Sequence, residues 1–363
     1  MGQLRILWVF MLIQTLVGVA FSHAEHVITV QDMVGRQVTV PRNPDRILCI
    51  APGTLRLIIY AEGKDKVVGV EDIEKRFPTT RPYWLAHNDL SDRPSIGPGG
   101  PNSINKEPDL EAILSANPQV IFISYMEKTK ADALEKKIRI PVVVLTYGPF
   151  GTFSEAIYDS LQVVGKVLCT ESRAERVIAF IEAAKKDLLS RVEGISERDK
   201  PSVYVGGVGF KGTHGIESTE SAYAPFEWVR AKSVVKAEGE KGHVFLDKEK
   251  ILAWDPDIIF IDAGGSDRIR KDYEKKTEFY QALTAFRERK VYVLHSFNWY
   301  MTNVGTVIAD AYAVGKILYP EVFVDVKPAE KAEEAYTFLL GRPVYTQMVK
   351  HHGPMGSLPG YLK

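Results

Sequence analysis

The chain has 363 residues, of which 45% are hydrophobic and 25% are charged, and this is the composition of an ordinary globular protein. Its 46 basic and 46 acidic side chains cancel, so charge gives no reason to expect a nucleic acid or an anionic membrane surface as partner. The length favours about two domains, each large enough for its own core.

The first residues have the pattern of an export signal. Arg5 precedes an apolar run from Ile6 to Phe21, and the run ends in the small residues Ser22 and Ala24. This pattern predicts a secretory signal peptide over residues 1–24 and a soluble mature chain in the periplasm or another extracytoplasmic space. A membrane anchor is the alternative, but the apolar run is shorter than the roughly 20 residues that cross a bilayer.

The next segment alternates between strand and helix patterns. Residues 27–43 alternate apolar and polar side chains and predict a hairpin, and "RILCIAP" predicts a buried strand. "GTLRLIIYAEG" has helical spacing, and "KVVGVED" has the pattern of a strand. A helix over residues 109–116 and the strands "QVIFIS" and "IPVVVLTYG" complete an N-terminal α/β lobe over residues 25–168.

A long amphipathic segment occupies the middle of the chain. Ser172 and Glu175 form a capping-box pattern, and Gly194 suits the end of a helix. A helix of about 21 residues is roughly 30 Å long, so we predict that residues 169–195 bridge two lobes. Its apolar stripe has helical spacing and consists of Val177, Ile181, Ala184, Leu188 and Val192.

After this helix the pattern restarts. Residues 247–262, "DKEKILAWDPDIIFID", match residues 109–124, "DLEAILSANPQVIFIS", at eight of sixteen positions without a gap. Chance similarity between two helix–strand units is the alternative explanation. We interpret the repeat as one equivalent unit in each of two Rossmann-like α/β lobes with parallel sheets. The second lobe is predicted over residues 196–325, and a helical tail over residues 326–363.

The two cysteines, Cys49 and Cys169, both lie in apolar segments. Export would permit a disulfide between them, but we expect two buried free thiols. Two cysteines are too few for a structural zinc site.

Sequence motifs of enzymes are absent or incomplete. Gly207, Gly209 and Gly212 have the spacing of a dinucleotide fingerprint, but no helix pattern opens there and no acidic residue follows about 20 positions on. The motifs G-x-S-x-G and H-E-x-x-H do not occur. We therefore expect a binding protein without cofactor. An exported enzyme that handles a metal chelate is the alternative.

Candidate ligand-binding residues lie in loops that follow predicted strands, where open α/β sheets carry their ligands. Aromatic side chains offer broad apolar area, and arginine binds carboxylates or phosphates in a bidentate manner. Tyrosine and histidine can also ligate a metal, so we regard His214, Tyr223 and His295 as possible metal ligands. The candidate ligand-binding residues are Arg76, Arg81, Tyr83, Trp84, Tyr125, Phe210, Lys211, His214, Tyr223, His295, Trp299 and Tyr300.

Residues 27–325 resemble the periplasmic solute-binding proteins of ABC importers that take up iron–siderophores, haem and cobalamin. The resemblance rests on "PDRILCIAPGTLRLIIYAEGKDKVVGVED", "PDLEAILSANPQVIFIS", the central helix and the restart at "LDKEKILAWDPDIIFID". It implies two α/β lobes bridged by one long helix, with the ligand in the cleft between them. It also implies a monomer that hands its ligand to a permease dimer in the membrane.

The resemblance further implies that one surface glutamate on each lobe docks against arginines of the permease. The matching positions are Glu111 and Glu249, which occupy the same place in the two copies of the repeat. Solvated helix glutamates without a partner are the alternative.

The class of the ligand stays open at this point. We expect a metal chelate of the ferric siderophore type, because aromatic loops favour a bulky organic ligand over a bare ion. A corrinoid, a haem, and a molybdate or tungstate oxyanion are the alternatives. The insertion "RPYWLAHNDLSDRPSIGPGGPNSINKEP" and the tail depart from shorter members of the family, so the resemblance assigns no ligand contacts.

Overall fold

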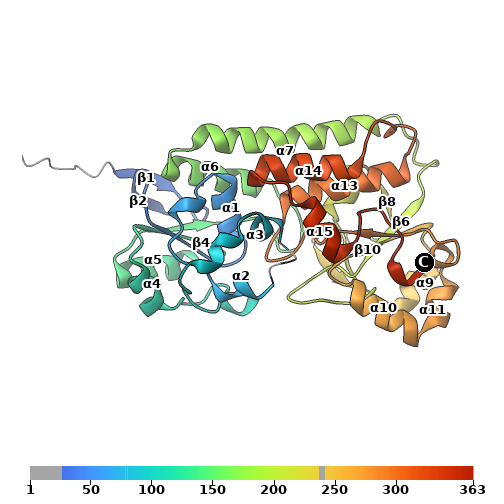
Figure 1. Ribbon diagram of the computed structural model, residues 1–363, viewed down its shortest axis with the longest axis horizontal. Coiled ribbons are helices and arrows are strands. Elements are labelled where there is room, and N and C mark those ends of the chain that lie inside the picture. Colours follow the sequence, from blue (N-terminus) through green and yellow to red (C-terminus); the bar gives the residue numbers. More distant parts are fainter. Residues whose placement is uncertain (1–26, 78, 80, 237–241, 363) are drawn as a thin grey trace, which may run out of the picture.

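The computed structural model describes residues 27–362, apart from residues 78, 80 and 237–241. Two α/β lobes lie side by side, and one long helix, α7, runs along both of them (Figure 1). The predicted fold class, two lobes with parallel sheets bridged by a long helix, is confirmed. The predicted signal peptide lies outside the described residues.

The N-terminal lobe contains a parallel sheet in the order β3-β4-β5 and an antiparallel hairpin of β1 with β2. Every residue of β3, β4 and β5 is buried, as expected for a parallel sheet covered on both faces. The strand expected over residues 66–72 is replaced by isolated bridges at Val67 and Val70. The strands are β1 (Val27–Gln31), β2 (Gln37–Pro41), β3 (Ile47–Ile50), β4 (Val120–Ser124) and β5 (Val142–Leu145). The helices are α1 (Thr54–Tyr60), α2 (Asp72–Arg76), α3 (Pro82–Ala86), α4 (Leu110–Ala116), α5 (Lys128–Ile138) and α6 (Ala156–Leu168).

The C-terminal lobe contains a parallel sheet in the order β11-β10-β6-β8 and a short antiparallel pair, β7 with β9. The two copies of the sequence repeat form α4–β4 in one lobe and α9–β10 in the other. Both helices end in a left-handed residue, Asn117 and Asp255, before a buried inner strand. The strands are β6 (Ser202–Gly206), β7 (Ser218–Glu220), β8 (Lys232–Ser233), β9 (His243–Phe245), β10 (Ile258–Asp262) and β11 (Val291–Leu294). The helices are α8 (Ala224–Glu227), α9 (Lys248–Trp254), α10 (Ser266–Lys275), α11 (Thr277–Ala282), α12 (Thr284–Arg287) and α13 (Val304–Leu318).

Helix α7 (Glu171–Arg191) has 21 residues and packs on α6 of one lobe and on α13 of the other. Its ends differ from the predicted ones. Thr170 is the N-cap, without a side-chain hydrogen bond, and Val192 is the C-cap, so Ser172 does not form the expected capping box. The largest hydrophobic core follows α6, α7 and α13 across both lobes, and each sheet has a smaller separate core on its other face.

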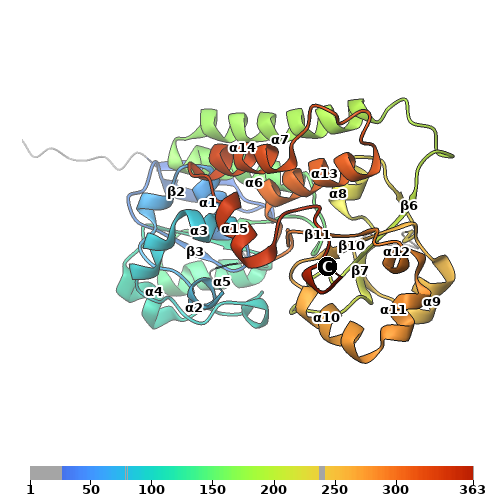
Figure 2. The same ribbon diagram turned by 45° about the vertical axis from the view of Figure 1, so that its right-hand side comes forward.

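The C-terminal tail connects the lobes a second time. Helix α14 (Pro328–Leu340) packs on α1 and α3 of the N-terminal lobe, and α15 (Tyr345–His352) also contacts α3. The chain then returns to the C-terminal lobe, where Val293 N donates to Ser357 O at 2.9 Å and Gly356 N donates to Val293 O at 2.8 Å. Figures 1 and 2 both place α15 between the lobes. A short 3₁₀ helix, Gly360–Leu362, ends the described chain.

Both cysteines are free thiols, as predicted, but only Cys49 is buried. Cys169 is half-buried because it is the left-handed C-cap of α6, at the end of that helix rather than inside it. Arg42 Nε donates a hydrogen bond to its sulfur at 3.1 Å. In the part of the chain that the structure describes, no helix is both long enough and apolar enough to cross a bilayer.

Candidate functional site

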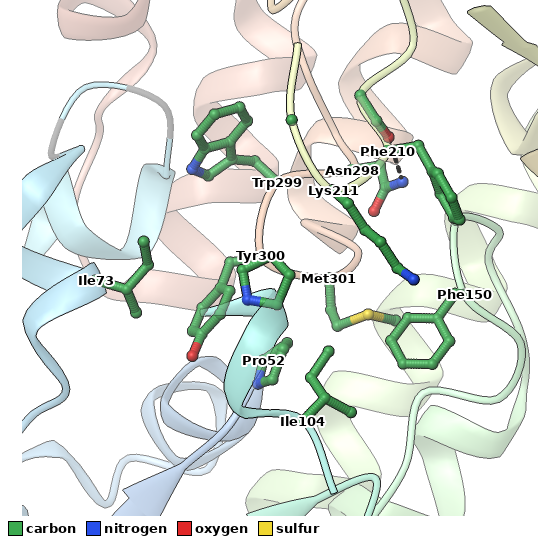
Figure 3. A pocket seen from close by; sticks show the side chains of 14 residues that line it. Pro52, Ile73, Ile104, Phe150, Phe210, Lys211, Asn298, Trp299, Tyr300 and Met301 are labelled. Atoms are coloured by element: carbon green, nitrogen blue, oxygen red, sulfur yellow. Dashed lines mark hydrogen bonds between the residues drawn. The ribbon is translucent and has the colours of Figure 1, made fainter. Parts of the chain in front are cut away.

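A pocket lies between the two lobes, where the loops after their strands face each other (Figure 3). The space in the pocket that no protein atom fills is about 700 Å³, including the part of its mouth that is open to solvent. The N-terminal lobe contributes Pro52, Ile73, Pro101, Ile104, Phe150 and Gly151. The C-terminal lobe contributes Gly209, Phe210, Lys211, Gly212, Asn298, Trp299, Tyr300 and Met301.

The wall from the N-terminal lobe is apolar. Pro101 and Ile104 come from the inserted loop of residues 81–108. Phe150 is 41% exposed and stacks on Tyr125, with ring centroids 4.3 Å apart. A ring held from behind in this way offers its other face to a ligand.

The wall from the C-terminal lobe consists of two linked loops. One follows β6 and contains residues 209–212, and the other follows β11 and contains residues 298–301. Asn298 Nδ2 donates to Gly209 O at 3.0 Å, which joins the two loops (Figure 3). Lys211, Tyr300 and Met301 have positive φ values of 52°, 52° and 68°. Such backbone conformations are strained for residues with a side chain and cluster at functional sites.

Among the described residues that line the pocket, Lys211 alone carries a charge. Its Nζ lies 5.5 Å from the centre of the Phe210 ring, and Figure 3 shows the side chain pointing into the pocket. It forms no ion pair with another described residue, so its charge remains available to a ligand.

Four of the predicted ligand-binding residues line this pocket: Phe210, Lys211, Trp299 and Tyr300. Two more lie directly behind it. Tyr125 supports Phe150, and a ring nitrogen of His214 lies 2.8 Å from Phe210 O. Phe77, which was not predicted, meets Trp299 edge to face with ring centroids 5.7 Å apart.

The structure places Arg81, Tyr83 and Trp84 inside the N-terminal lobe rather than on the pocket, with exposures of 0 to 2%. Arg81 Nε lies 3.3 Å from a carboxylate oxygen of Glu74, and the Tyr83 hydroxyl donates to the same carboxylate. The physical reason is local, because Pro82 begins a short helix whose side chains pack inward, where a loop was expected. Arg76 ends α2, is exposed, and does not line the pocket.

The predicted residues Tyr223 and His295 are also buried, at 2% and 0% exposure. The Tyr223 ring packs on Phe226 and Phe297. His295 Nε2 lies 2.8 Å from Gly353 O in the tail, and burial lowers the pKa of His295 to about 4. Within the described residues, no group of three or more histidine, cysteine or acidic side chains is arranged to hold a metal ion.

The sequence-based prediction named none of the six described residues that the N-terminal lobe contributes to the pocket wall. Ile73 and Phe150 are apolar residues of ordinary type in segments that carried no motif, and Ile104 lies in the insertion, which the sequence marked only as a departure from shorter family members. Asn298 and Met301 lie in the same loop as Trp299 and Tyr300, but only these two aromatic residues were predicted to bind the ligand.

Glu111 and Glu249 occupy the first turns of the equivalent helices α4 and α9, and both are exposed. Neither forms an ion pair with another described residue. Leu114, one turn after Glu111, is 53% exposed on the same helix. Permease docking by the two glutamates stays a prediction.

A family model described as "Periplasmic binding protein" matches residues 63–297. The molybdate-binding protein MolA of Haemophilus influenzae is 21% identical over 338 residues, covering 86% of this chain and 90% of that protein. The solved structure of MolA with bound molybdate has a TM-score of 0.68 at 18% identity, covering 87% of this chain and 98% of that one.

Two further solved structures show the same fold. A periplasmic solute-binding protein from Veillonella parvula has a TM-score of 0.72 at 18% identity, covering 90% of this chain and 96% of that one. CeuE of Helicobacter pylori, solved with Ni(II) bound, has a TM-score of 0.62 at 14% identity, covering 86% of this chain and 96% of that one. The ligands in these structures differ, with molybdate in MolA and Ni(II) in CeuE.

Proposed function

Because this chain belongs to the periplasmic binding protein family and is a substrate-binding protein of an ABC importer, we propose that its ligand is a metal chelate with an organic shell. A ferric siderophore-type complex is the leading candidate. The protein would hold the chelate between its lobes and deliver it to a membrane permease.

The observation that supports this proposal is the apolar and aromatic character of the pocket wall. Phe150, Phe210, Trp299 and Met301 present carbon surface from both lobes. Burying the organic shell of a chelate against such a wall contributes roughly 25 cal/mol per Å² of apolar area. A bare oxyanion would gain little from it, because an anion needs several convergent donors to offset its lost hydration.

Lys211 supports a ligand with a negative group. An ammonium ion is a point charge that attracts a carboxylate, a phenolate or an oxyanion without demanding a planar partner. The side chain points into the pocket from a loop whose backbone is held in a left-handed conformation. The negative part of the ligand would therefore lie on the side of the C-terminal lobe.

A molybdate or tungstate oxyanion is the second candidate. It is favoured by the similarity to MolA, which binds molybdate. In this case Lys211 and the Asn298 amide would hold the anion against the loop of residues 209–212, and the aromatic wall would have no partner.

A direct titration separates the two candidates. Purified protein is titrated with a ferric trihydroxamate, with Ni(II)–histidine and with molybdate, and binding is followed by calorimetry and by tryptophan fluorescence. We expect the ferric chelate to bind most tightly. Lys211→Met should weaken an anionic chelate about tenfold and leave a neutral chelate of the same size unchanged. Tight molybdate binding without chelate binding would overturn the proposal in favour of the oxyanion.

A further inference from the structure

The loop that follows β11, residues 298–302 and here called the pocket loop, is held by the opposite lobe. Arg56 of α1 reaches it from the N-terminal lobe. Its Nη1 donates to Thr302 O at 2.9 Å, and its Nη2 donates to Trp299 O at 3.1 Å and to Tyr300 O at 3.0 Å. Three backbone oxygens of a ligand-facing loop are thus bound by one side chain from across the cleft.

Tyr300 forms a second contact between the lobes. Its ring lines the pocket, and its hydroxyl donates to Glu71 Oε2 at 2.6 Å. The same hydroxyl accepts from Gly100 N at 3.0 Å, and Glu71 also accepts from Ala51 N at 3.1 Å. One phenol therefore links the pocket loop to α2, to the inserted loop and to the end of β3.

We propose that Arg56 and Glu71 are positioning residues for ligand binding, which hold the pocket loop of the opposite lobe in its ligand-ready conformation. The inference rests on the proposed function only in taking this pocket as the ligand site. Neither residue lines the pocket, so each would act through the loop it holds.

The surroundings of Arg56 fit this role. Its side chain is 0% exposed and lies over the rings of Tyr83 and Tyr147, at 4.8 and 5.8 Å from their centres. Among the described residues no carboxylate lies within ion-pair distance of it. A buried guanidinium needs acceptors for its N–H groups, and here most of them are the carbonyls of the pocket loop. Tyr83, expected in the sequence to touch ligand, packs against this guanidinium instead.

The pocket loop requires such support. Tyr300 and Met301 both have positive φ, a conformation that persists only where the surrounding structure fixes it. Arg56 donates to the carbonyl oxygens of Trp299 and Tyr300. These two oxygens belong to the peptide groups directly before and directly after the Tyr300 Cα atom. Without these hydrogen bonds the loop would not hold the Trp299 and Tyr300 rings at the pocket.

The Glu71 contact also responds to protons. Burial raises the pKa of Glu71 to about 7, and the acidic neighbours Glu74 and Asp72 on the same helix act in the same direction. The other titratable groups around it are Cys49 of β3, Arg81, which precedes α3 and pairs with Glu74, and Tyr300, whose pKa is raised well above its usual value. Tyr300 therefore remains a donor, and ionised Glu71 is the stronger acceptor.

The direction of the pH effect follows. Above about pH 7 Glu71 is ionised and holds Tyr300 firmly, and below it the contact weakens. Ligand affinity should fall as the pH is lowered from 8 to 6. Folding stability responds in the opposite sense to this group, because an acid with a raised pKa favours the folded state at low pH. A loss of binding by general destabilisation would not show this opposition.

The first test needs no ligand. Amide hydrogen exchange is measured in the full chain, in Tyr300→Phe and in Tyr158→Phe, a control that breaks a Tyr–Glu contact with Glu182 away from the pocket. We expect exchange at Gly100 to rise at least tenfold in Tyr300→Phe and to stay unchanged in the control. Unchanged Gly100 exchange in Tyr300→Phe would overturn the proposed contact.

The second test measures affinity for a ferric trihydroxamate at pH 6 to 8 in wild type, Glu71→Gln and Arg56→Lys. Wild type should lose affinity several-fold at pH 6, and Glu71→Gln should show a flat profile. Arg56→Lys should bind at least tenfold more weakly at every pH, because a shorter side chain with one compact ammonium group cannot place donors at both the Nη1 and Nη2 positions that reach the loop. A sloping profile in Glu71→Gln, or normal affinity in Arg56→Lys, would overturn the inference. If wild type binds no chelate, the proposed ligand fails, and the same pH series with molybdate as probe then tests the positioning role of Arg56 and Glu71.

Discussion

His295, which follows strand β11, lies with its Nε2 at 2.8 Å from the backbone oxygen of Gly353 in the C-terminal tail. The ring is 0% exposed and also neighbours His352 of α15, with ring centroids 5.6 Å apart. This contact fastens the tail to the C-terminal lobe after α14 and α15 have packed on the other lobe.

The first prediction concerns pH and this histidine. Burial lowers the pKa of His295 to about 4, so the folded chain keeps it neutral while the unfolded chain binds a proton below about pH 6.5. Its contribution to stability should therefore be lost as the pH falls from 6.5 towards 4, by up to about 3 kcal/mol. Glu71 and Asp262, whose pKa values are raised, act in the opposite direction.

The measurement is the difference in unfolding free energy between wild type and His295→Gln across this range. If the unfolding free energy depended on pH in the same way in wild type and His295→Gln, the prediction would be wrong. The control is His351→Gln, which changes an exposed histidine and should keep the wild-type pH dependence.

The second prediction concerns motion of the lobes. A long helix is a stiff connector, and the tail adds a second one, so opening and closing around ligand should be small. X-ray scattering curves with and without ligand should nearly coincide for the full chain. A chain that ends after Gly341 loses α15 and the strand-like contact with Val293, and its curves should separate. A large contraction of the full chain on ligand binding would contradict this prediction.

The third prediction contrasts two tryptophans. Trp299 lines the pocket, so Trp299→Ala should weaken ligand binding by about 1–3 kcal/mol and leave the fold intact. Trp84 is 2% exposed, so Trp84→Ala should instead lower the unfolding free energy by about 3–5 kcal/mol. Calorimetric binding and chemical denaturation on the same two variants check this. Normal binding by a folded Trp299→Ala protein would remove Trp299 from the site.

The fourth prediction concerns Tyr223. Its hydroxyl is buried and has no hydrogen-bond partner among the described residues. Removing a buried polar group without a partner relieves its desolvation cost, so Tyr223→Phe should raise the unfolding free energy by about 1 kcal/mol. Ligand affinity should not change, since the ring and not the hydroxyl packs on Phe226 and Phe297. A loss of ligand affinity in Tyr223→Phe would indicate that the Tyr223 hydroxyl contacts the ligand.

The fifth prediction concerns Glu111 and Glu249. A carboxylate in the first turn of a helix is worth only about 0.3–1 kcal/mol to that helix, so reversing both to Lys should leave folding and ligand affinity nearly intact. Uptake through the permease should fall sharply, because each like-charge contact at an interface costs several kcal/mol. Each single reversal should give a partial loss. Unchanged uptake by the double variant would leave these residues as solvated helix glutamates, and reversal of the exposed Glu175 on α7 is the control.

The sequence by itself determined the two-lobed α/β fold, its long central helix and the repeated helix–strand unit. Apolar residues that recur with the period of a helix or strand share one face whatever that face later packs against, so elements such as α7, β4 and β10 follow from the local pattern. Four pocket residues in the loops after β6 and β11 were predicted for a related reason, because carboxyl ends of parallel strands meet at one edge of a sheet.

Only the tertiary structure decided which aromatic and basic side chains face the pocket. Trp84 and Trp299 carry the same local signal, an aromatic residue in a polar segment, yet one packs inside the N-terminal lobe and the other lines the cleft. Arg56 lies 246 positions from Thr302, whose carbonyl it binds. Such contacts depend on how the lobes are set against each other by α7, α13 and the tail, and hydrophobic periodicity along the chain carries no information about them.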